Sequence, residues 1–123
     1  MAQPNFHYDE PGDTLFISFQ PGKKATGVEL NEHILLRIDR NDETAVGITI
    51  FDYSLVAQKT EMGPRSFPLD GLRELSAELR ELVLRLLRRP PVSDVLAVST
   101  YTPSMVKNVP ITSLQPLPIA AGE

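Results

Sequence analysis

Two histidines are the side chains of this sequence best suited to acid–base or metal chemistry. His7 and His33 are its only histidines, and each falls on the polar side of a segment with alternating apolar residues. On neighbouring strands, the two imidazoles could bind zinc together or exchange protons. A closed zinc site takes four ligands, and the chain has no cysteine, so the others would be carboxylates such as Glu29 or Glu32. We retain His7 and His33 as a candidate polar site, beside the simpler interpretation of two surface or half-buried histidines without a catalytic role.

Two acidic segments could attract a hard cation. Asp9, Glu10 and Asp13 could gather oxygens around Ca²⁺, which takes roughly 6–8 of them, but the Pro-Gly between these residues is typical of a tight turn. In the segment that begins at Asp39, the calcium-loop position that requires glycine holds Thr44, and the position of the final glutamate holds isoleucine. We therefore interpret the first segment as a turn and exclude a calcium loop in the second. The sequence predicts no metal, no cofactor and no catalytic residue.

Composition and motifs argue against several further classes of activity. The chain has 12 basic and 16 acidic residues, a net charge of −4 that does not suit general binding to phosphate backbones. The arginines of residues 73–89 alternate with glutamates, and that segment has no aromatic residue to stack on bases. Phosphate-loop, nucleophile-elbow and dinucleotide-binding motifs are absent from the sequence. We predict no nucleic-acid partner, and the sequence does not point to an enzyme.

Alternating residues identify the elements that would position these side chains. Residues 14–19, 33–38 and 46–50 alternate apolar and polar side chains, as half-buried strands do, and residues 6–8 and 26–30 are shorter candidates. Because the connections are short turns, the strands should be antiparallel. The sequence predicts an antiparallel β-meander of about five strands, with one apolar face.

A single long amphipathic helix is predicted over residues 70–89, with Asp70 as its N-cap and Pro90-Pro91 ending it. Its leucines recur at steps of three and four residues: Leu72, Leu75, Leu79, Leu82 and Leu86. We expect this stripe to cover the apolar face of the sheet and to contact a second chain at one edge. The leucines that we assign to that candidate interface are Leu75, Leu79, Leu82 and Leu86.

The remaining residues, 90–123, form an extension that holds six of the 11 prolines. Residues 94–102 resemble a strand, whereas residues 106–114 suit an edge strand or a loop because Pro110 cannot donate a backbone hydrogen bond. A Pro-rich tail follows. The predicted fold is α+β in a single domain over residues 1–123, whose C-terminal strand either returns to the sheet or crosses to a partner.

The strand region also carries a family pattern, in the strings YDEPGDTLFISF, GVEL and ILLRIDRNDETAVGITIFDYS. The matching positions are Tyr8, Asp9, Asp13, Leu15, Phe16, Ile17, Glu29, Ile34, Leu35, Asp39, Gly47, Ile48 and Ile50. In order and spacing, residues 6–55 resemble the bacterial domain-of-unknown-function family 2283. Phe16 departs from the tyrosine common there, and Thr44 stands where we expect glycine in the last turn. The resemblance implies the strand pattern and, for some members, a partnership with small toxin-like proteins.

Two functional hypotheses follow. The first is a protein-interaction module, either a homodimer or one half of a pair with a small, toxin-like partner protein. The alternative is a small enzyme or metal-binding domain that uses His7, His33 and nearby carboxylates. We expect the protein to be cytoplasmic, because no apolar run approaches the ~20 residues of a membrane span and cysteine is absent.

Overall fold

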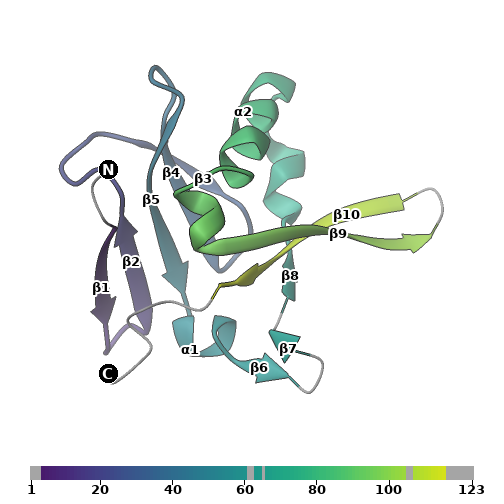
Figure 1. The fold of residues 1–123 in the computed structure, drawn as a ribbon, viewed down its shortest axis with the longest axis horizontal. Coiled ribbons are helices and arrows are strands. Elements are labelled where there is room, and N and C mark those ends of the chain that lie inside the picture. The colour runs from purple at the N-terminus through teal and green to yellow at the C-terminus, as the bar shows by residue number, and fades with distance from the viewer. Residues whose placement is uncertain (1–3, 61–62, 65, 105–106, 116–123) are drawn as a thin grey trace.

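A five-stranded antiparallel sheet is the largest element of the computed structural model, which describes residues 4–60, 63–64, 66–104 and 107–115. Its strands are β1 (Asn5–Asp9), β2 (Thr14–Ser18), β3 (Thr26–Glu29), β4 (Ile34–Asp39) and β5 (Thr44–Phe51). All five coincide with the segments predicted from alternation. The α+β class and the antiparallel five-stranded sheet are therefore confirmed (Figure 1).

The order of the strands differs from a simple meander. It is β1-β2-β5-β4-β3, so β2 pairs with β5, and the chain after β2 runs to the opposite edge of the sheet to begin β3. Burial explains this order: six of the eight residues of β5 are buried, which requires a central position, whereas β3 has one buried residue and suits an edge. Alternation identifies a half-buried strand but does not specify which strand lies beside it, and the predicted meander is wrong at this connection.

One face of the sheet forms the core of the protein. Its fully buried side chains include Leu15, Ile17, Ile34, Leu36, Ile38, Ile48 and Ile50. They belong to one cluster with four residues of helix α2 (Ala77–Leu87), namely Leu82, Val83, Leu86 and Leu87. The prediction that leucines of this region cover the sheet is correct.

The predicted helix over residues 70–89 is divided into two elements. Residues Asp70–Glu74 form a 3₁₀ helix, η1, after which Leu75 is extended and Ser76 caps α2 by accepting a hydrogen bond from the Leu79 N–H (3.2 Å). Asp70 is therefore not the N-cap of the long helix, and α2 has 11 residues. The leucine spacing continues across the break because η1 and α2 bury their leucines against the same core, although they are separate elements.

The other elements are short or belong to a second sheet. They are α1 (Tyr53–Val56), β6 (Lys59–Thr60), β7 (Gly63–Pro64), β8 (Ser66–Pro68), η2 (Val92–Asp94), β9 (Leu96–Ser104) and β10 (Lys107–Leu114). The predicted C-terminal strand is present as β9, but it does not return to the five-stranded sheet. It pairs with β10 in a three-stranded sheet of order β8-β10-β9, and the two long strands extend away from the rest of the fold (Figure 1).

Pro110 explains part of that second sheet. β8 pairs with residues 111–113 of β10 only, so Pro110 lies outside the stretch that has neighbours on both sides. Within the described residues, Lys107–Leu114 therefore forms a strand that has neighbours on both sides at one end and a free side at the other, where the missing donor of proline is tolerated. The predicted Pro-rich tail falls on residues 116–119, outside the described part of the chain.

Candidate functional site

The two histidines of the predicted polar site are far apart. His7 is exposed on β1 and stacks on Phe16 of β2, with 6.1 Å between ring centroids. His33 immediately precedes β4, and its side chain is only 12% exposed. β2 and β5 lie between β1 and β4, which separates the two histidines by roughly 14 Å, three strand spacings. They are not brought together, so a zinc ion shared between them has no geometric basis.

His33 lies between two carboxylates. Its Nδ1 is 3.2 Å from Asp52 Oδ2, and its Nε2 is 3.5 Å from Glu32 Oε1. The Asp52 contact has the distance of an ion pair but not the alignment of a hydrogen bond, so Nδ1 is buried without a hydrogen-bond partner. The ring also meets Phe67 edge-on, with 5.2 Å between centroids. These contacts fix the ring in one position.

His33 lines a pocket of about 680 Å³ between β3 and η1. Residues of β3 and of the β3–β4 turn line one side, and residues from Phe67 to Leu75, together with Leu79, line the other. Its apolar lining consists of Val28, Phe67, Pro68, Leu75 and Leu79. Its ionisable lining consists of Glu29, Glu32, Asp70, Glu74, Arg73 and His33. The volume is within the range of ligand sites, but the lining is more highly charged than is usual for sites that bind small molecules.

A close backbone contact joins the two sides of the pocket. The Gly71 N–H donates to the Leu30 carbonyl (2.8 Å), which ties η1 to the end of β3. A β-carbon on Gly71 would overlap the Glu29 carbonyl oxygen and lie 2.9 Å from that of Leu30. Only glycine fits at this position without displacing one of the two elements.

Asn31 forms a second link between the two sides. Its side chain is buried, and its Oδ1 accepts from the N–H groups of His33 (2.8 Å) and Ile34 (2.9 Å). Its Nδ2 donates to the Pro68 carbonyl (3.1 Å). The turn that presents His33 is thus fixed to the chain that enters η1. Neither Asn31 nor Gly71 was predicted as a site residue, because both act through long-range backbone contacts.

The outer side of β3 is a free strand edge within this pocket. Within the described part of the chain β3 pairs only with β4, and the Leu30 N–H donates to the Ile34 carbonyl (2.9 Å). Because antiparallel pairing alternates along a strand, this bond places the N–H and C=O of Gly27 and Glu29 on the side away from β4. The Glu29 carbonyl faces Gly71, which leaves the backbone of Gly27 directed into the pocket.

The four leucines of the candidate interface are divided between core and pocket. Leu82 and Leu86 are 6% and 5% exposed and belong to the core. Leu75 and Leu79 are half-buried and line the pocket. Leu75 and Leu79 are thus the more exposed pair of the four.

The first acidic segment forms a turn. The Asp13 carboxylate accepts hydrogen bonds from the Tyr8 hydroxyl (2.7 Å) and from the backbone N–H (3.1 Å) and hydroxyl (2.9 Å) of Ser54. These donors, Tyr8 first, hold the pKa of Asp13 below its usual value, and the same contact raises the pKa of Tyr8. Within the described residues, no group of three or more histidine and carboxylate side chains is arranged to hold a metal ion.

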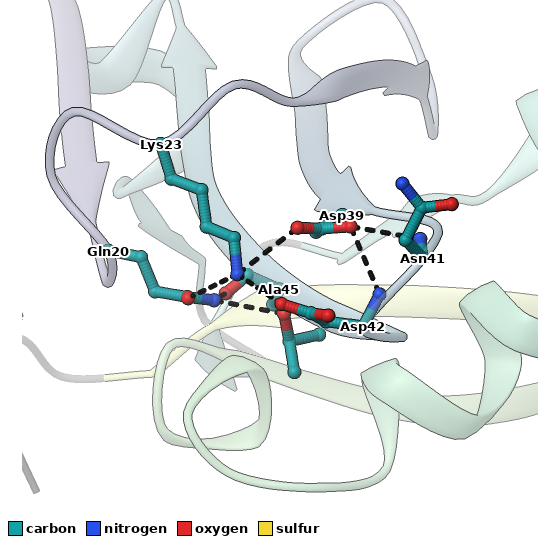
Figure 2. Close-up of polar contacts among 7 residues, drawn as sticks. Gln20, Lys23, Asp39, Asn41, Asp42 and Ala45 are labelled. Atoms are coloured by element: carbon teal, nitrogen blue, oxygen red, sulfur yellow. Dashed lines mark hydrogen bonds and ion pairs between the residues drawn. The ribbon is translucent and has the colours of Figure 1, made fainter.

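The second acidic segment fixes the long connection from β2 to β3 (Figure 2). Asp39 Oδ1 accepts from the N–H groups of Asn41 (2.9 Å) and Asp42 (3.1 Å), while Lys23 Nζ contacts Asp39 (3.1 Å), Asp42 (2.6 Å) and the Gln20 side-chain oxygen (3.1 Å). The backbone donors and Lys23 lower the pKa of Asp39, and Asp42 with Asp39 raises the pKa of Lys23. This cluster has a structural role.

Three non-glycine residues of the described chain adopt the left-handed backbone: Asp13, Glu43 and Asp52, with φ of 50°, 55° and 56°. We expected glycine at the position of Thr44, but the residue with the backbone conformation that glycine favours is its neighbour Glu43. Asp is tolerated in this region more readily than Glu, because its short side chain bonds locally.

Comparison with known proteins identifies a family over the first part of the chain. A family model described as "Protein of unknown function (DUF2283)" matches residues 5–54, close to the range that the sequence pattern indicated. No curated protein and no solved structure matches the chain. Within the described residues, no helix has the length and apolar character needed to cross a bilayer. The match covers less than half of the chain, and over residues 5–54 the protein is similar to the DUF2283 family.

Proposed function

We propose that this protein is a protein-interaction module that binds a small partner protein in the pocket between β3 and η1. The observation that supports this proposal is the combination of a free strand edge at Gly27 with an apolar wall at Leu75 and Leu79. Extended peptide segments bind to such edges through their backbones and place alternate side chains in adjacent pockets. Burial of Leu82 and Leu86 leaves too little of the leucine stripe for a paired-helix homodimer, so we favour a different partner.

A second pocket is less suited to this role. It has a volume of about 570 Å³ and lies between the β4–β5 turn and the end of α2, lined by Phe19, Thr44, Leu86 and Pro91 among others. Both β4 and β5 have strands on either side. A partner there would meet side chains but no free strand edge.

The alternative function is an acid–base enzyme centred on His33. The observation that favours it is the Asp52 carboxylate 3.2 Å from Nδ1, since a carboxylate in this place can orient an imidazole for proton transfer. Against it, Nε2 is directed to Glu32, and the residues that line the pocket include no serine, threonine, cysteine or lysine to act as a nucleophile. We therefore place the interaction role first.

The test compares two leucine substitutions. Leu79→Glu introduces a charge into the pocket, and Leu55→Glu introduces the same charge at a leucine of α1 that is 41% exposed and outside it. Tagged wild type and Leu55→Glu should recover the same small protein from a lysate of the source organism, and Leu79→Glu should lose it while its circular dichroism shows a folded chain. The purified pair should then reconstitute.

Recovery of that protein by Leu79→Glu at wild-type levels would place the interface elsewhere and refute the proposal. The proposal would also be refuted if light scattering shows a monomer and no variant, including the wild type, recovers a partner from the lysate. The two hypotheses differ in what they predict for His33→Gln. If the protein is an enzyme, this variant should lose turnover of a substrate. If it is an interaction module, the variant should still bind its partner.

A further inference from the structure

We propose that the segment bound in this pocket is an extended, basic stretch of the partner, which adds to the free edge of β3 as a further strand. This inference rests on the proposed function and specifies the chemistry of its partner. Three observations carry it: the direction of the Gly27 backbone, the excess negative charge around the pocket, and the apolar residues beside that charge.

The backbone of Gly27 sets the mode of binding. Its N–H and C=O are directed away from β4 into the pocket, and its neighbour Thr26 is exposed. η1 occupies the far end of the edge, where Gly71 contacts Glu29 and Leu30. The edge is therefore open for a few residues only, and a bound segment would form a short ladder centred on Gly27. Side chains must supply the rest of the affinity.

The charge of the pocket indicates which side chains of the bound segment would contribute to affinity. Four carboxylates and one guanidinium line the pocket, an excess of three negative charges. Within the described residues, Glu29, Asp70 and Glu74 have no ion pair with a basic side chain, and the contact of Glu32 is with His33. Lysine or arginine side chains on a bound strand would compensate these carboxylates, and the same field would accelerate association with a basic partner.

The apolar lining argues for a polypeptide over a small cation. Phe67, Leu75 and Leu79 lie beside the carboxylates, so a ligand that alternates apolar and basic side chains satisfies both. In a strand the side chains alternate in direction, and such a segment can direct its apolar residues to Leu79 and its basic residues to Glu29 and Glu74. A simple polyamine would leave the apolar wall and the Gly27 backbone without partners.

The first part of the test uses synthetic peptides with the full chain. A fluorescent seven-residue peptide in which lysine and valine alternate should bind in an anisotropy titration at 50 mM NaCl, and binding should weaken at least about tenfold at 500 mM NaCl because salt screens exposed charges. Peptides with glutamate or threonine in place of lysine should bind at least about tenfold more weakly. Equal binding of the threonine peptide would refute the basic character of the segment.

The second part locates the charge. Glu29→Lys with Glu74→Lys should weaken the lysine peptide about tenfold, whereas Glu10→Lys with Glu81→Lys, which makes the same change in net charge at exposed residues outside the pocket, should leave it within about threefold. Equal losses in the two double variants would show that net charge alone attracts the peptide and would overturn the proposed site. Displacement of the peptide by spermidine at matched charge concentration would show a site for small cations and overturn it as well.

The third part tests the added strand. Two lysine–valine peptides carry N-methyl groups on complementary sets of alternate residues, so that one set blocks the amides that would face β3 and the other does not. One peptide should fail to bind and the other should bind within about threefold of the parent, because only alternate amides of a strand face its neighbour. Equal binding of both would refute strand addition.

The outcome for the proposed function is independent of these peptides. If no lysine–valine peptide binds while partner recovery still depends on Leu79, the basic strand is refuted and the interaction module stands. If recovery is also independent of Leu79, both proposals fail.

Discussion

Replacing Gly71 with alanine should detach η1 from β3 and lower the free energy of unfolding by a net of about 1–3.5 kcal/mol, which is a loss of about 2–4 kcal/mol less the gain from a more restricted unfolded chain. The new β-carbon would overlap the Glu29 carbonyl oxygen and lie 2.9 Å from the Leu30 carbonyl oxygen, and both are backbone atoms that no side-chain rotation can move. Displacement of η1 breaks the 2.8 Å hydrogen bond from Gly71 to Leu30, worth about 1 kcal/mol. It also draws part of Leu72, which is 5% exposed, out of the core, at a cost of about 1–3 kcal/mol.

Gly27→Ala is the matched control, because Gly27 lines the same pocket from the opposite side. Its β-carbon would meet only the end of the Leu35 side chain, at 3.4 Å, so we expect no destabilisation and a gain of at most about 1 kcal/mol. Urea unfolding followed by far-ultraviolet circular dichroism gives both values from the midpoint and slope. Alanine also restricts the unfolded chain, which by itself stabilises by about 0.4–1 kcal/mol, so any loss at Gly71 is a net effect. Equal stabilities of the two variants would refute the close contact between η1 and β3.

Three further predictions concern the turns and the helix start. Glu43→Gly should raise the free energy of unfolding by about 0.5–1 kcal/mol, because the residue adopts φ of 55°, whereas Glu43→Ala should not; urea midpoints distinguish the two. Asp13→Asn should destabilise the protein at neutral pH. Because the Asp13 pKa is lowered on folding, that contribution is present above the usual value of 3.8 and is lost as the pH falls through the lowered pKa, so unfolding curves of variant and wild type should converge there. Arg80→Met removes 2.9 Å hydrogen bonds to two carbonyls at the end of η1 and should cost about 1–3 kcal/mol, while Arg85→Met, which loses only an exposed ion pair, should change stability by less than about 0.5 kcal/mol. Equal melting temperatures of the two arginine variants would contradict a stabilising role for the Arg80 hydrogen bonds to the Leu72 and Leu75 carbonyls.

The sequence predicts the strands better than their arrangement. Residues 14–19 and 33–38 alternate because one face of each strand is more deeply buried than the other, a local property that the sequence contains. Residues 46–50 also alternate in sequence, although β5 is buried on both faces. The pairing of β2 with β5 depends on the total burial of β5 and on the Lys23 contacts with Asp39 and Asp42, which fix the crossing connection. Those contacts join residues far apart in sequence, so no local pattern reports them.

The predicted start of the helix at residue 70 was wrong for a related reason. Leucine spacing from Leu72 to Leu86 measures which side chains are buried and not the conformation between them. The signal that could have located the start of α2 is Ser76, an N-cap residue within the predicted helix, and Gly71 is a second interruption of it. For the site, the sequence indicated His33, the carboxylates Glu29 and Glu32, and both leucines of the pocket, Leu75 and Leu79. It missed Asn31 and Gly71, which hold the pocket together.

Several residues of the family pattern have structural roles that account for their type. Tyr8 donates to Asp13, and Asp39 accepts the backbone donors of its turn. A β-carbon at Gly47 would overlap the guanidinium of Arg37 and lie 2.6 Å from the Ile17 carbonyl oxygen, so glycine lets Arg37 lie across the sheet. These positions specify the sheet and its turns. They do not specify the pocket.

The boundary of the family match passes through the candidate site. Within residues 5–54, β3 and its turn supply Gly27, Glu29 and His33 to the pocket. The opposite side, from Phe67 to Leu79, lies outside the match, and it supplies the apolar wall and two of the four carboxylates. The matched residues therefore include the edge strand β3, whereas the apolar wall of the pocket lies in the second half of the chain, outside the match. A partner of this protein should consequently be recognised through Phe67, Leu75 and Leu79, and substitution of these three residues, with the core residues Leu69 and Leu72 and the close-packed Gly71 kept, should change partner choice while it leaves the five-stranded sheet intact.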